Sequence, residues 1–333
     1  MKEKKVKKIV RQKLQPITNF LSTGCTILDL ALADKLPGGF AGGRVSHVYG
    51  WESSAKTVLA QEPLGSAQRQ GGLIWFLDAE QTLDLERAKN LFGIDTDSKT
   101  FHYGVPETIE GLFDNHIAEA IKEIHEKEMT DKPNVVALDS LSALPTVAEK
   151  EVDLEKGTYG MTRAKQISTA YRKYLRALND ANLALVMINQ ARVNVNARFG
   201  DKMTVSGGKA IDFYASVSVS MSNIGKIKNA RKMVIGNEFK FKVTKNKIAP
   251  PHRTGTFSLL YEYGIDDVRT NLQWLRELRD EKGNYTFGTL EYKALDDIVK
   301  AIENDNLEVA LQEEVVKEWR LLYPPLDRKP RVR

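Results

Sequence analysis

Residues 49–58, YGWESSAKTV, decide how the rest of the chain is interpreted. They nearly match G-x-x-x-x-G-K-[ST], the loop pattern that wraps nucleotide phosphates, but Ala55 stands in place of the second glycine. RVSHVY before the loop is typical of a strand and KTVLAQ after it opens a helix, which is the strand–loop–helix order that such a loop requires. The stretch therefore predicts a phosphate-binding loop; the alternative is a polar turn that contains Lys-Thr by chance.

Each position of this loop has a physical task. Backbone N–H groups and the helix N-terminus bind the anion, Lys56 reaches the outer phosphates, and Thr57 can ligate Mg²⁺. Gly50 gives the turn its backbone freedom, and Ala55 adds only a methyl group, which is a mild change if its φ stays negative. Pro63, further along the helix, is expected to kink it without reaching the phosphates. The residues expected to contact the nucleotide are Gly50, Trp51, Glu52, Ser53, Ser54, Ala55, Lys56 and Thr57.

Carboxylates end two apolar strands, and an open α/β sheet binds its ligands at that end of its strands. NVVALDS carries Asp139, placed to hold the magnesium shell beside Thr57. LIWFLDAE carries Asp78 and Glu80, and Glu80 can polarise the water that attacks the γ-phosphate of ATP. A solvated carboxylate that caps the next helix is the alternative for Glu80. With the loop, these residues predict an ATP and Mg²⁺ site whose metal contacts are Thr57 and Asp139.

Short apolar runs alternate with helical patterns from about residue 21 to 265. The strand candidates are RVSHVY, LIWFLDA, NVVALDS and LALVMIN, and the helix candidates include TVLAQEPLGSAQ, TIEGLFDNHIAEAIKEIHE and RAKQISTAYRKYLRALND. This order predicts a mainly parallel α/β sheet covered by helices on both faces. SVSVSMS, EFKFKVTK and TGTFSLLY alternate with a period of two and predict antiparallel strands at one sheet edge. From about residue 266 the pattern is mainly helical, with GNY and PP as breaks, and predicts a small appended domain.

The composition is that of an ordinary globular protein, with 42% apolar and 28% charged residues. The longest apolar runs are too short to cross a membrane and the N-terminus has no secretory apolar segment, so no membrane partner is expected. Cys25 is the single cysteine, which excludes an internal disulfide and favours a cytoplasmic location. It lies in an apolar helical pattern, which predicts a buried thiol.

The net charge of +5 is a property of the two ends of the chain. Residues 1–15 carry +6 and residues 327–333 carry +3, which leaves −4 for everything between them. Basic arms often touch nucleic acid, and a solvated tail is the alternative at each end.

Several stretches occur in the order found in RecA recombinases. They are STGCTILDLAL, GWESSAKT, FLDAEQTLD, ALDSLSAL, MINQARVNVNARFG, SGGKAIDFYASV and KVTKNKIAPP. On these stretches the chain resembles a divergent, phage-type RecA across roughly residues 20–265, and the last seventy or so residues are less similar. The resemblance implies a basic N-terminal segment at 1–20 that docks on a neighbouring subunit, an ATPase core at 21–265, and a small C-terminal domain with a basic tail at 266–333. It also implies the cytoplasm of a bacterium, or of the host if the chain is phage-encoded.

The resemblance implies further catalytic roles. Gln190 would sense the γ-phosphate and pass the signal into the loop that follows, and Lys245 and Lys247 would reach the nucleotide of a neighbouring subunit. The sequence supports that placement, because the two lysines continue the face of Phe239 and Phe241 beyond the apolar stretch. The full catalytic set implied is Lys56, Glu80, Gln190, Lys245 and Lys247.

Some residues differ from those that the family carries at the same position, and the role of one has two interpretations. Arg87 occupies the place of an adenine-stacking tyrosine, and a guanidinium can stack on a base. Ala55 replaces a glycine at a position where phage members of the family vary. Phe213 matches an aromatic residue that packs into the adjoining subunit, with an ordinary core phenylalanine as the alternative. The N-terminal segment is shorter and more basic than in the family, and the C-terminal tail is basic where bacterial members carry an acidic one.

Two polar loops would hold DNA. Residues 150–161 lead into a helix on which Lys165 and Arg172 share one face, because seven residues separate them. Residues 191–207 form a long, polar, glycine-bearing segment, which in a compact domain more often serves a function. Basic side chains and exposed amides suit a grip on single-stranded DNA that is indifferent to sequence. Lys240 and Lys242 match the family's second DNA site, with a solvated strand face as the alternative. The second loop and its border contribute Arg192, Arg198, Phe199, Gly207 and Gly208.

The residues and the resemblance together predict a DNA-dependent ATPase. It would form a helical filament on single-stranded DNA and exchange strands with a homologous duplex in recombination and repair. One alternative is a DNA-coating filament protein that binds nucleotide with weak or no hydrolysis, and the other is a RecA-like regulatory ATPase without strand exchange. The retained Glu80, Gln190, Lys245 and Lys247 favour the recombinase, because a binding module has no need of all four.

Overall fold

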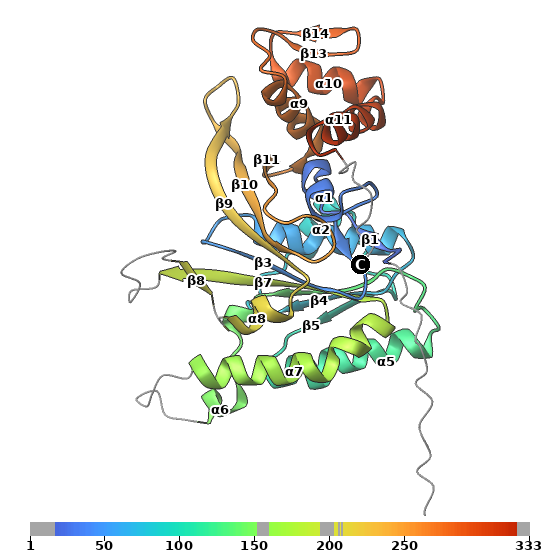
Figure 1. Cartoon of the computed structure of the whole chain (residues 1–333), viewed down its shortest axis with the longest axis vertical. Helices are drawn as coiled ribbons and strands as arrows, with labels where there is room; N and C mark the ends of the chain where they lie inside the picture. The colour runs from blue at the N-terminus through green and yellow to red at the C-terminus, as the bar shows by residue number, and fades with distance from the viewer. Residues whose placement is uncertain (1–16, 152–159, 194–202, 206, 208, 325–333) are drawn as a thin grey trace, which may run out of the picture.

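A single large sheet forms the centre of the molecule in the computed structural model, which describes residues 17–151, 160–193, 203–205, 207 and 209–324 (Figure 1). The strand order is β12-β11-β10-β9-β3-β7-β6-β4-β5, with β8 beside β7. Neighbours from β9 to β5 are parallel and neighbours from β9 to β12 are antiparallel, which confirms the predicted fold class. The strands are β3 (Val45–Gly50), β4 (Ile74–Asp78), β5 (Phe101–Gly104), β6 (Asn134–Asp139), β7 (Leu183–Val193), β8 (Met203–Val205), β9 (Val217–Lys228), β10 (Val234–Asn246), β11 (Thr254–Leu260) and β12 (Gly264–Asp266).

The register of the parallel strands brings their carboxyl ends level with one another. Gly50, the last residue of β3, pairs with Gln190 of β7. Asp78, the last residue of β4, pairs with Asp139, the last residue of β6. The loop that follows β3, the two strand-end carboxylates and the glutamine therefore lie along one edge of the sheet.

Helices cover both faces of the sheet, because successive strand residues point to opposite sides. In β6, Val135 and Ala137 pack into one core whereas Val136 and Leu138 pack into the other. This is why the strands read as continuous apolar runs. The first core is closed by α1 (Thr26–Ala33), α2 (Lys56–Arg69), α3 (Leu85–Phe92), α9 (Asp267–Leu278), α10 (Leu295–Asn304) and α11 (Glu308–Leu322). The second core is closed by α5 (Ala118–Glu126), α7 (Gly160–Asp180) and α8 (Lys209–Tyr214).

Short elements complete the described part of the chain. A π-helical turn precedes α5 and a 3-10 turn follows β6, and α2 continues through Pro63. The sequence analysis did not predict β5, or the hairpin of β13 and β14 within the otherwise helical C-terminal part. The short elements are β1 (Phe20–Leu21), β2 (Phe40–Ala41), α4 (Ile109–Gly111), the turns Leu112–Ile117 and Leu141–Ala143, α6 (Val147–Lys150), β13 (Tyr285–Phe287) and β14 (Leu290–Tyr292).

Two further predictions concern single features. Cys25 is a free thiol and is fully buried, as predicted from its apolar surroundings. Across the described ranges, the longest helices are either too short or too polar to span a membrane.

Polar bonds tie the C-terminal helices to α1. The Asp267 carboxylate at the start of α9 accepts hydrogen bonds from the Thr26 backbone N–H and hydroxyl, each at 2.7 Å. Two more carboxyl groups, Asp29 of α1 and Glu62 of α2, lie near enough to interact with it. Burial raises the pKa of Asp29 to about 7 and that of Glu62 to about 8, and it also raises the pKa of Asp267.

The raised pKa of Glu62 predicts that the folded chain loses stability as the pH rises. The folded state holds a proton on Glu62 up to about pH 8, whereas the unfolded chain releases it near the ordinary value of 4.5, so the free energy of unfolding falls across that interval. Glu62→Gln removes the charged form. We expect it to raise the free energy of unfolding at pH 8.5 by about 4 kcal/mol and to change it little at pH 5.

The measurement is urea unfolding of nucleotide-free protein at both pH values. Glu119→Gln, at an exposed position of α5, is the matched control and should leave the pH dependence as it is in the native chain. An equal slope of stability against pH in the Glu62→Gln and native chains would show that Glu62 titrates normally.

Candidate nucleotide and DNA site

The phosphate loop connects the end of β3 to the start of α2. A side chain at Gly50 would place its Cβ 2.3 Å from the Met221 carbonyl oxygen and 2.7 Å from Ser54 Oγ, so only glycine fits there. Ser54 Oγ donates a hydrogen bond to the Trp51 carbonyl at 2.7 Å, and Lys56 Nζ donates to the same oxygen at 2.6 Å. The loop therefore curls around the Lys56 ammonium group, the group expected to meet the outer phosphates.

The backbone conformation of Ala55 differs from the one that the sequence led us to expect. Its φ is +61°, in the left-handed region, so the negative φ that would make the methyl group a mild change is not present. It is the N-cap of α2, and the chain must turn through this conformation to pass from the loop into the helix. An alanine there costs roughly 1 kcal/mol more than a glycine, because its Cβ crowds the following carbonyl oxygen. The substitution is therefore a strained one.

Oxygen donors gather beside Lys56 at the ends of β4 and β6. Thr57 Oγ1 donates to Asp139 Oδ2 at 2.6 Å, and Ser140 Oγ donates to Glu80 Oε1 at 2.7 Å. Burial raises the pKa of Asp139 to about 6. Burial lowers the pKa of Lys56, and the carboxylates of Asp139, Glu80 and Glu52 oppose that shift. The site thus places one cation among several acceptors.

This donor set fits a magnesium ion carried by a nucleotide. The Thr57 hydroxyl and the Asp139 carboxylate are hard oxygen ligands, and Mg²⁺ in phosphate-transfer sites takes one or two protein oxygens and the rest from phosphate and water. Within the described ranges, no group of three or more His, Cys, Asp or Glu side chains could hold a metal ion by itself. The residues therefore suit a metal that arrives with its substrate.

Asp78 has a different task from the one its strand-end position suggested. It lies at the predicted edge, but its Oδ2 accepts hydrogen bonds from the backbone N–H groups of Thr82 and Leu83, each at 2.8 Å. The side chain is fully buried. Asp78 thereby shapes the loop that carries Glu80.

Gln190 joins the phosphate loop to β7. Its Nε2 donates to Glu52 Oε1 at 3.0 Å, and its backbone N–H donates to Ser142 Oγ at 2.7 Å. A hollow of about 420 Å³ opens beside this contact and is lined by Trp51, Glu52, Gln190, Ala191 and Arg192. Ser140 and Ser142 are not among the predicted site residues, and no sequence pattern distinguishes them from ordinary serines that follow a strand.

Lys245 and Lys247 lie away from the phosphate loop of their own chain. Lys245 pairs with Ser218 of β9, which in turn pairs with His47 on β3, three residues before Gly50. Lys245 Nζ donates to the backbone carbonyls of Asp212 and Phe213 at the end of α8. Burial, and then Lys247, lower the pKa of Lys245.

Phe213, on the same helix end, is 71% exposed. The core alternative for this residue is therefore wrong. The exposed phenylalanine and the two lysines share one region of the surface.

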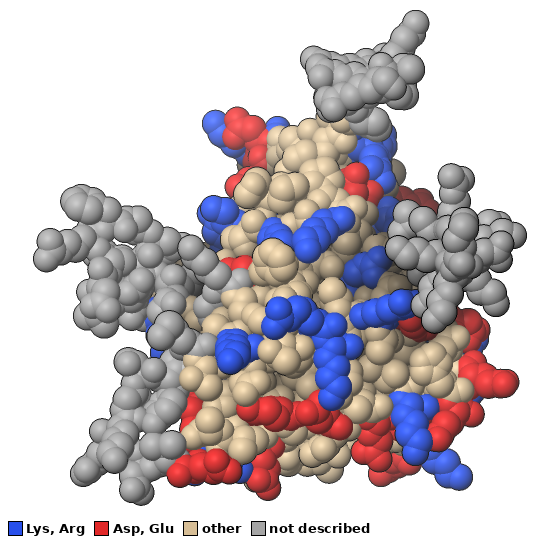
Figure 2. Space-filling view, turned by 60° about the horizontal axis from the view of Figure 1, so that its bottom comes forward, with Lys and Arg blue, Asp and Glu red and all other residues tan. Residues whose placement is uncertain are grey.

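The predicted DNA residues lie on three elements. Lys165 and Arg172 are exposed on α7, Arg192 is exposed on β7, and Lys240 and Lys242 are exposed on β10. Figure 2 brings forward the lower part of Figure 1, where α7 and α5 lie, and shows Lys and Arg gathered across the middle of that face with Asp and Glu along its lower rim.

The described residues include only some of the other residues predicted to contact DNA or the base. Arg198, Phe199, Gly208 and most of both predicted DNA loops lie outside the described residues. Gly207 has a φ of +83°, a backbone conformation that favours glycine. Arg87 is exposed in the first turn of α3, where its backbone N–H donates to Asp84.

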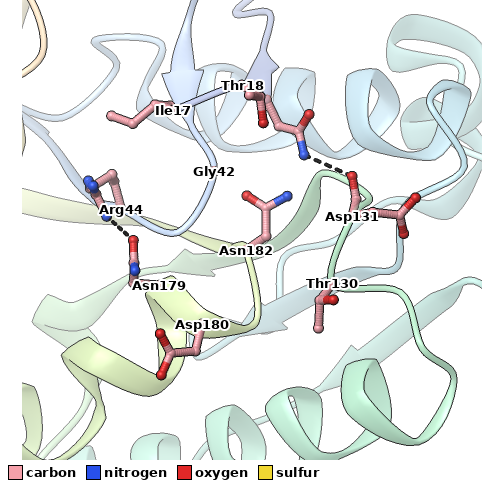
Figure 3. A pocket seen from close by; sticks show the side chains of 10 residues that line it. Ile17, Thr18, Gly42, Arg44, Thr130, Asp131, Asn179, Asp180 and Asn182 are labelled. Carbon is pink, nitrogen blue, oxygen red and sulfur yellow. Dashed lines mark hydrogen bonds between the residues drawn. The ribbon is translucent and has the colours of Figure 1, made fainter. Parts of the chain in front are cut away.

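A second hollow, of about 450 Å³, lies at the opposite edge of the sheet (Figure 3). Arg44 and Asn182, which directly precede β3 and β7, help to line it, so it faces the amino ends of the strands. Ligands of open α/β sheets bind at the carboxyl ends. Its polar groups bond to one another, as when Asn19 donates to the Asp131 carbonyl at 3.0 Å and Arg44 donates to Asn179. None of the predicted site residues lines it.

Comparison with known proteins identifies the family. Residues 3–266 match the family model of the RecA N-terminal domain. The chain is 36% identical over 262 residues to Protein RecA of Wolbachia sp. subsp. Brugia malayi, which covers 78% of this chain and 69% of that protein. It is 38% identical over 248 residues to Protein RecA of Colwellia psychrerythraea, covering 74% and 67%, and 38% identical over 246 residues to Protein RecA of Clostridium botulinum, covering 74% and 64%.

The matches span about two thirds of the length of these relatives, and the family-model match over residues 3–266 spans the phosphate loop, both strand-end carboxylates and Gln190. The chain therefore belongs to the RecA family of DNA-dependent ATPases with a phosphate loop.

Proposed function

We propose that this chain hydrolyses ATP while it is assembled as a helical filament on single-stranded DNA, and that the filament exchanges strands with a homologous duplex. The convergence of the phosphate loop, Glu80, Asp139 and Gln190 on one sheet edge carries this proposal. Arg192, two residues after Gln190 on the same strand, lies close to that edge and would supply a cation for DNA binding.

ATP with Mg²⁺ is the substrate that these residues suit. Lys56 and the loop N–H groups would hold the outer phosphates, as the helix N-terminus and its basic side chain do in other phosphate loops. Thr57 and Asp139 would hold the metal, and a bound Mg²⁺ neutralises the charge that develops on the phosphate oxygens. Arg87 would lie against the base by stacking its guanidinium plane.

Glu80 is the residue proposed to orient the attacking water. Its carboxylate is exposed towards the site and is held in place by the Ser140 hydroxyl at 2.7 Å. A fixed carboxylate at this position can accept the water's hydrogen bond and aim it along the line of attack. A DNA-coating protein without hydrolysis has no need of a carboxylate oriented in this way, which argues against that alternative.

Gln190 is proposed to couple nucleotide to DNA. Its side-chain amide donates to Glu52 in the phosphate loop. A γ-phosphate would compete with Glu52 for the same amide, and β7 carries any displacement of Gln190 directly to Arg192 and the loop at 191–207. Since such coupling is reciprocal, ATP should tighten single-strand binding and the single strand should tighten ATP binding.

The primary DNA contact is proposed on α7 and the end of β7. Lys165, Arg172 and Arg192 would neutralise phosphates, together with the amides of the glycine-bearing loop. This grip would be indifferent to sequence, because phosphate contacts position DNA without reading bases. The further residues proposed for this site are Arg198, Phe199, Gly207 and Gly208, and those proposed for the second DNA site are Lys240 and Lys242.

Lys245 and Lys247 are proposed to act on the nucleotide of a neighbouring subunit. Their strand register separates them from the Gly50 loop of their own chain, and the exposed Phe213 beside them offers a large apolar anchor for a subunit contact. Cations supplied in trans stabilise the charge of a phosphoryl-transfer transition state, as an arginine finger does. Hydrolysis would then require assembly.

The shared site predicts complementation between two inactive variants. Lys56→Ala lacks the phosphate lysine, and Lys245→Ala/Lys247→Ala lacks the lysines supplied in trans, so each filament should hydrolyse little ATP alone. Mixed on single-stranded DNA, the two form some interfaces that pair an intact phosphate loop with intact lysines. We expect the steady-state hydrolysis rate of the mixture to recover part of the native rate.

The control is Lys240→Ala/Lys242→Ala, two lysines of the same strand on its exposed face, which should not need complementation for hydrolysis. If the mixture stays inactive while fluorescence transfer between labelled chains shows that both variants co-assemble, the lysines act within their own chain.

The strain at Ala55 predicts that a glycine relaxes the loop without creating the activity. Ala55→Gly should raise the free energy of unfolding by about 1 kcal/mol, because glycine adopts a positive φ without a steric penalty. ATP turnover should change only modestly, because Lys56, Thr57, Asp139 and Glu80 are already in place.

Urea unfolding and a steady-state hydrolysis assay check the two parts, with Ala60→Gly inside α2 as the control that should destabilise the chain instead. A native chain without hydrolysis above the Lys56→Ala background, together with an active Ala55→Gly chain, would mean that the alanine damages the site.

A further inference from the structure

The β9–β10 hairpin projects beyond the sheet as a two-stranded ribbon. Among the described residues, β3 pairs with β9 only over residues 217–221 and β11 pairs with β10 only over residues 236–242. From residue 222 of β9 onward the hairpin therefore has one open edge, and its tip has two. Figure 1 shows the ribbon rising past β11 as a separate arm beside the C-terminal helices.

The end of the ribbon is ordered by its own turn. Asn229 Oδ1 accepts hydrogen bonds from the backbone N–H groups of Arg231 and Met233, each at 3.0 Å. Two backbone bonds close the same turn, between the Asn229 N–H and the Met233 carbonyl at 3.0 Å and between the Lys232 N–H and the Asn229 carbonyl at 2.8 Å. The side chains that follow are thus presented on a fixed support.

The ribbon is strongly basic. Residues 217–246 contain seven Lys or Arg and a single acid, Glu238. Glu238 accepts a hydrogen bond from Gln273 Nε2 at 3.1 Å and so is engaged with α9. Within the part of the chain that the structure describes, no carboxylate forms an ion pair with the four cations of the ribbon end, which are Lys226, Lys228, Arg231 and Lys232.

The ribbon as a whole carries cations on both of its faces, with Lys240 on one and Lys226 on the other. Paired residues share a face, and Lys240 pairs with Ser222, whereas Lys226 pairs with Asn237. Asn237 and Lys240 are three residues apart on β10, so their side chains point to opposite faces of the ribbon. Lys226 shares the face of its partner Asn237 and therefore lies on the other face from Lys240. A register shift at Glu238 and Phe239 produces this change of face.

We propose that this ribbon is a duplex-binding arm, which inserts into a groove of double-stranded DNA between the two phosphate backbones. A two-stranded ribbon fits the major groove of B-form DNA. Cations on both faces would meet the phosphates on either side of that groove, an arrangement that one single strand cannot satisfy. The proposal rests on the proposed DNA-binding function and extends its second site from Lys240 and Lys242 to the end of the hairpin.

The apolar side chains of the arm fit the same partner. Met233 is 64% exposed at the turn, and Ile224 is 50% exposed further down β9, at the register shift. Exposed apolar side chains can contact the thymine methyl groups that line the major groove. Single-strand grips instead rely on exposed aromatic rings on which bases stack. The aromatic residues of the ribbon, Phe239 and Phe241, are both buried.

Protection of the open strand edge is the competing explanation, because exposed edges often carry lysine to prevent pairing with another chain. Lys226 and Lys228 lie along that edge, but Arg231 and Lys232 lie in the turn beyond it. The turn residues therefore separate the two explanations.

The test measures how tightly filaments of the native and variant chains capture a labelled duplex of unrelated sequence. The filaments are assembled on unlabelled single-stranded DNA in the presence of a non-hydrolysable ATP analogue. We expect neutralisation of all four end cations to weaken duplex binding at least about tenfold and to make the slope of log affinity against log salt shallower by about two to four. Arg231→Gln/Lys232→Gln alone should produce about half of that change in slope. The four-residue variant is Lys226→Gln, Lys228→Gln, Arg231→Gln and Lys232→Gln.

The matched control removes four lysines that are exposed elsewhere, which are Lys99, Lys122, Lys282 and Lys300. It should leave duplex capture and the salt slope unchanged, and a charge-preserving Lys226→Arg/Lys228→Arg/Lys232→Arg variant should bind duplex as the native chain does. ATP hydrolysis stimulated by single-stranded DNA should persist in the ribbon variants, which shows that assembly and the primary site are intact.

Three outcomes would overturn the proposal. They are unchanged duplex binding in Arg231→Gln/Lys232→Gln, an equal loss in the control, or a parallel loss of single-strand binding and hydrolysis. If the four-residue variant aggregates while Arg231→Gln/Lys232→Gln binds duplex as the native chain does, the lysines serve to protect the strand edge. If the native chain itself shows no hydrolysis stimulated by single-stranded DNA, the proposed function fails, and this result is distinct from a failure confined to the ribbon variants.

Discussion

The parallel register of β3, β7, β6 and β4 is the constraint on which the rest of the site depends. It sets Gly50 opposite Gln190 and Asp78 opposite Asp139, so residues far apart in the sequence end at one edge. Two cores of interleaved side chains fix that register, because a slip by one residue would move every apolar side chain to the other face. The chemistry of the site therefore relies on packing that extends through the whole sheet.

Short hydrogen bonds convert this register into a working arrangement. The Thr57–Asp139 bond at 2.6 Å joins the start of α2 to the end of β6, and the Ser140–Glu80 bond at 2.7 Å joins the ends of β6 and β4. The Gln190–Glu52 contact at 3.0 Å connects the phosphate loop with the strand that leads to the loop proposed to bind DNA. Each bond spans two elements, so a change at the nucleotide would have a physical route to the proposed DNA site.

The sequence was sufficient for the fold class and the phosphate loop, because continuous apolar strands, alternating strands and the loop pattern each leave a periodic or positional signal. It could not reveal the torsion of Ala55, since φ there depends on how the loop joins β3 to α2. Ser140 and Ser142 carry no pattern that separates them from ordinary serines, and β5 and the β13–β14 hairpin are too short for a clear period. Phe213 lies in an apolar stretch that reads as core, and its exposure became visible only in three dimensions.

The central claim is that the phosphate loop and the DNA-facing strand act as one unit, completed by a neighbouring subunit. The most direct test is the steady-state rate of ATP hydrolysis by the native chain, measured with and without single-stranded DNA at one protein concentration. The account predicts a low rate for the free protein and a rate several-fold higher on DNA. Equal rates in the two conditions, with DNA binding confirmed in the same samples, would contradict it.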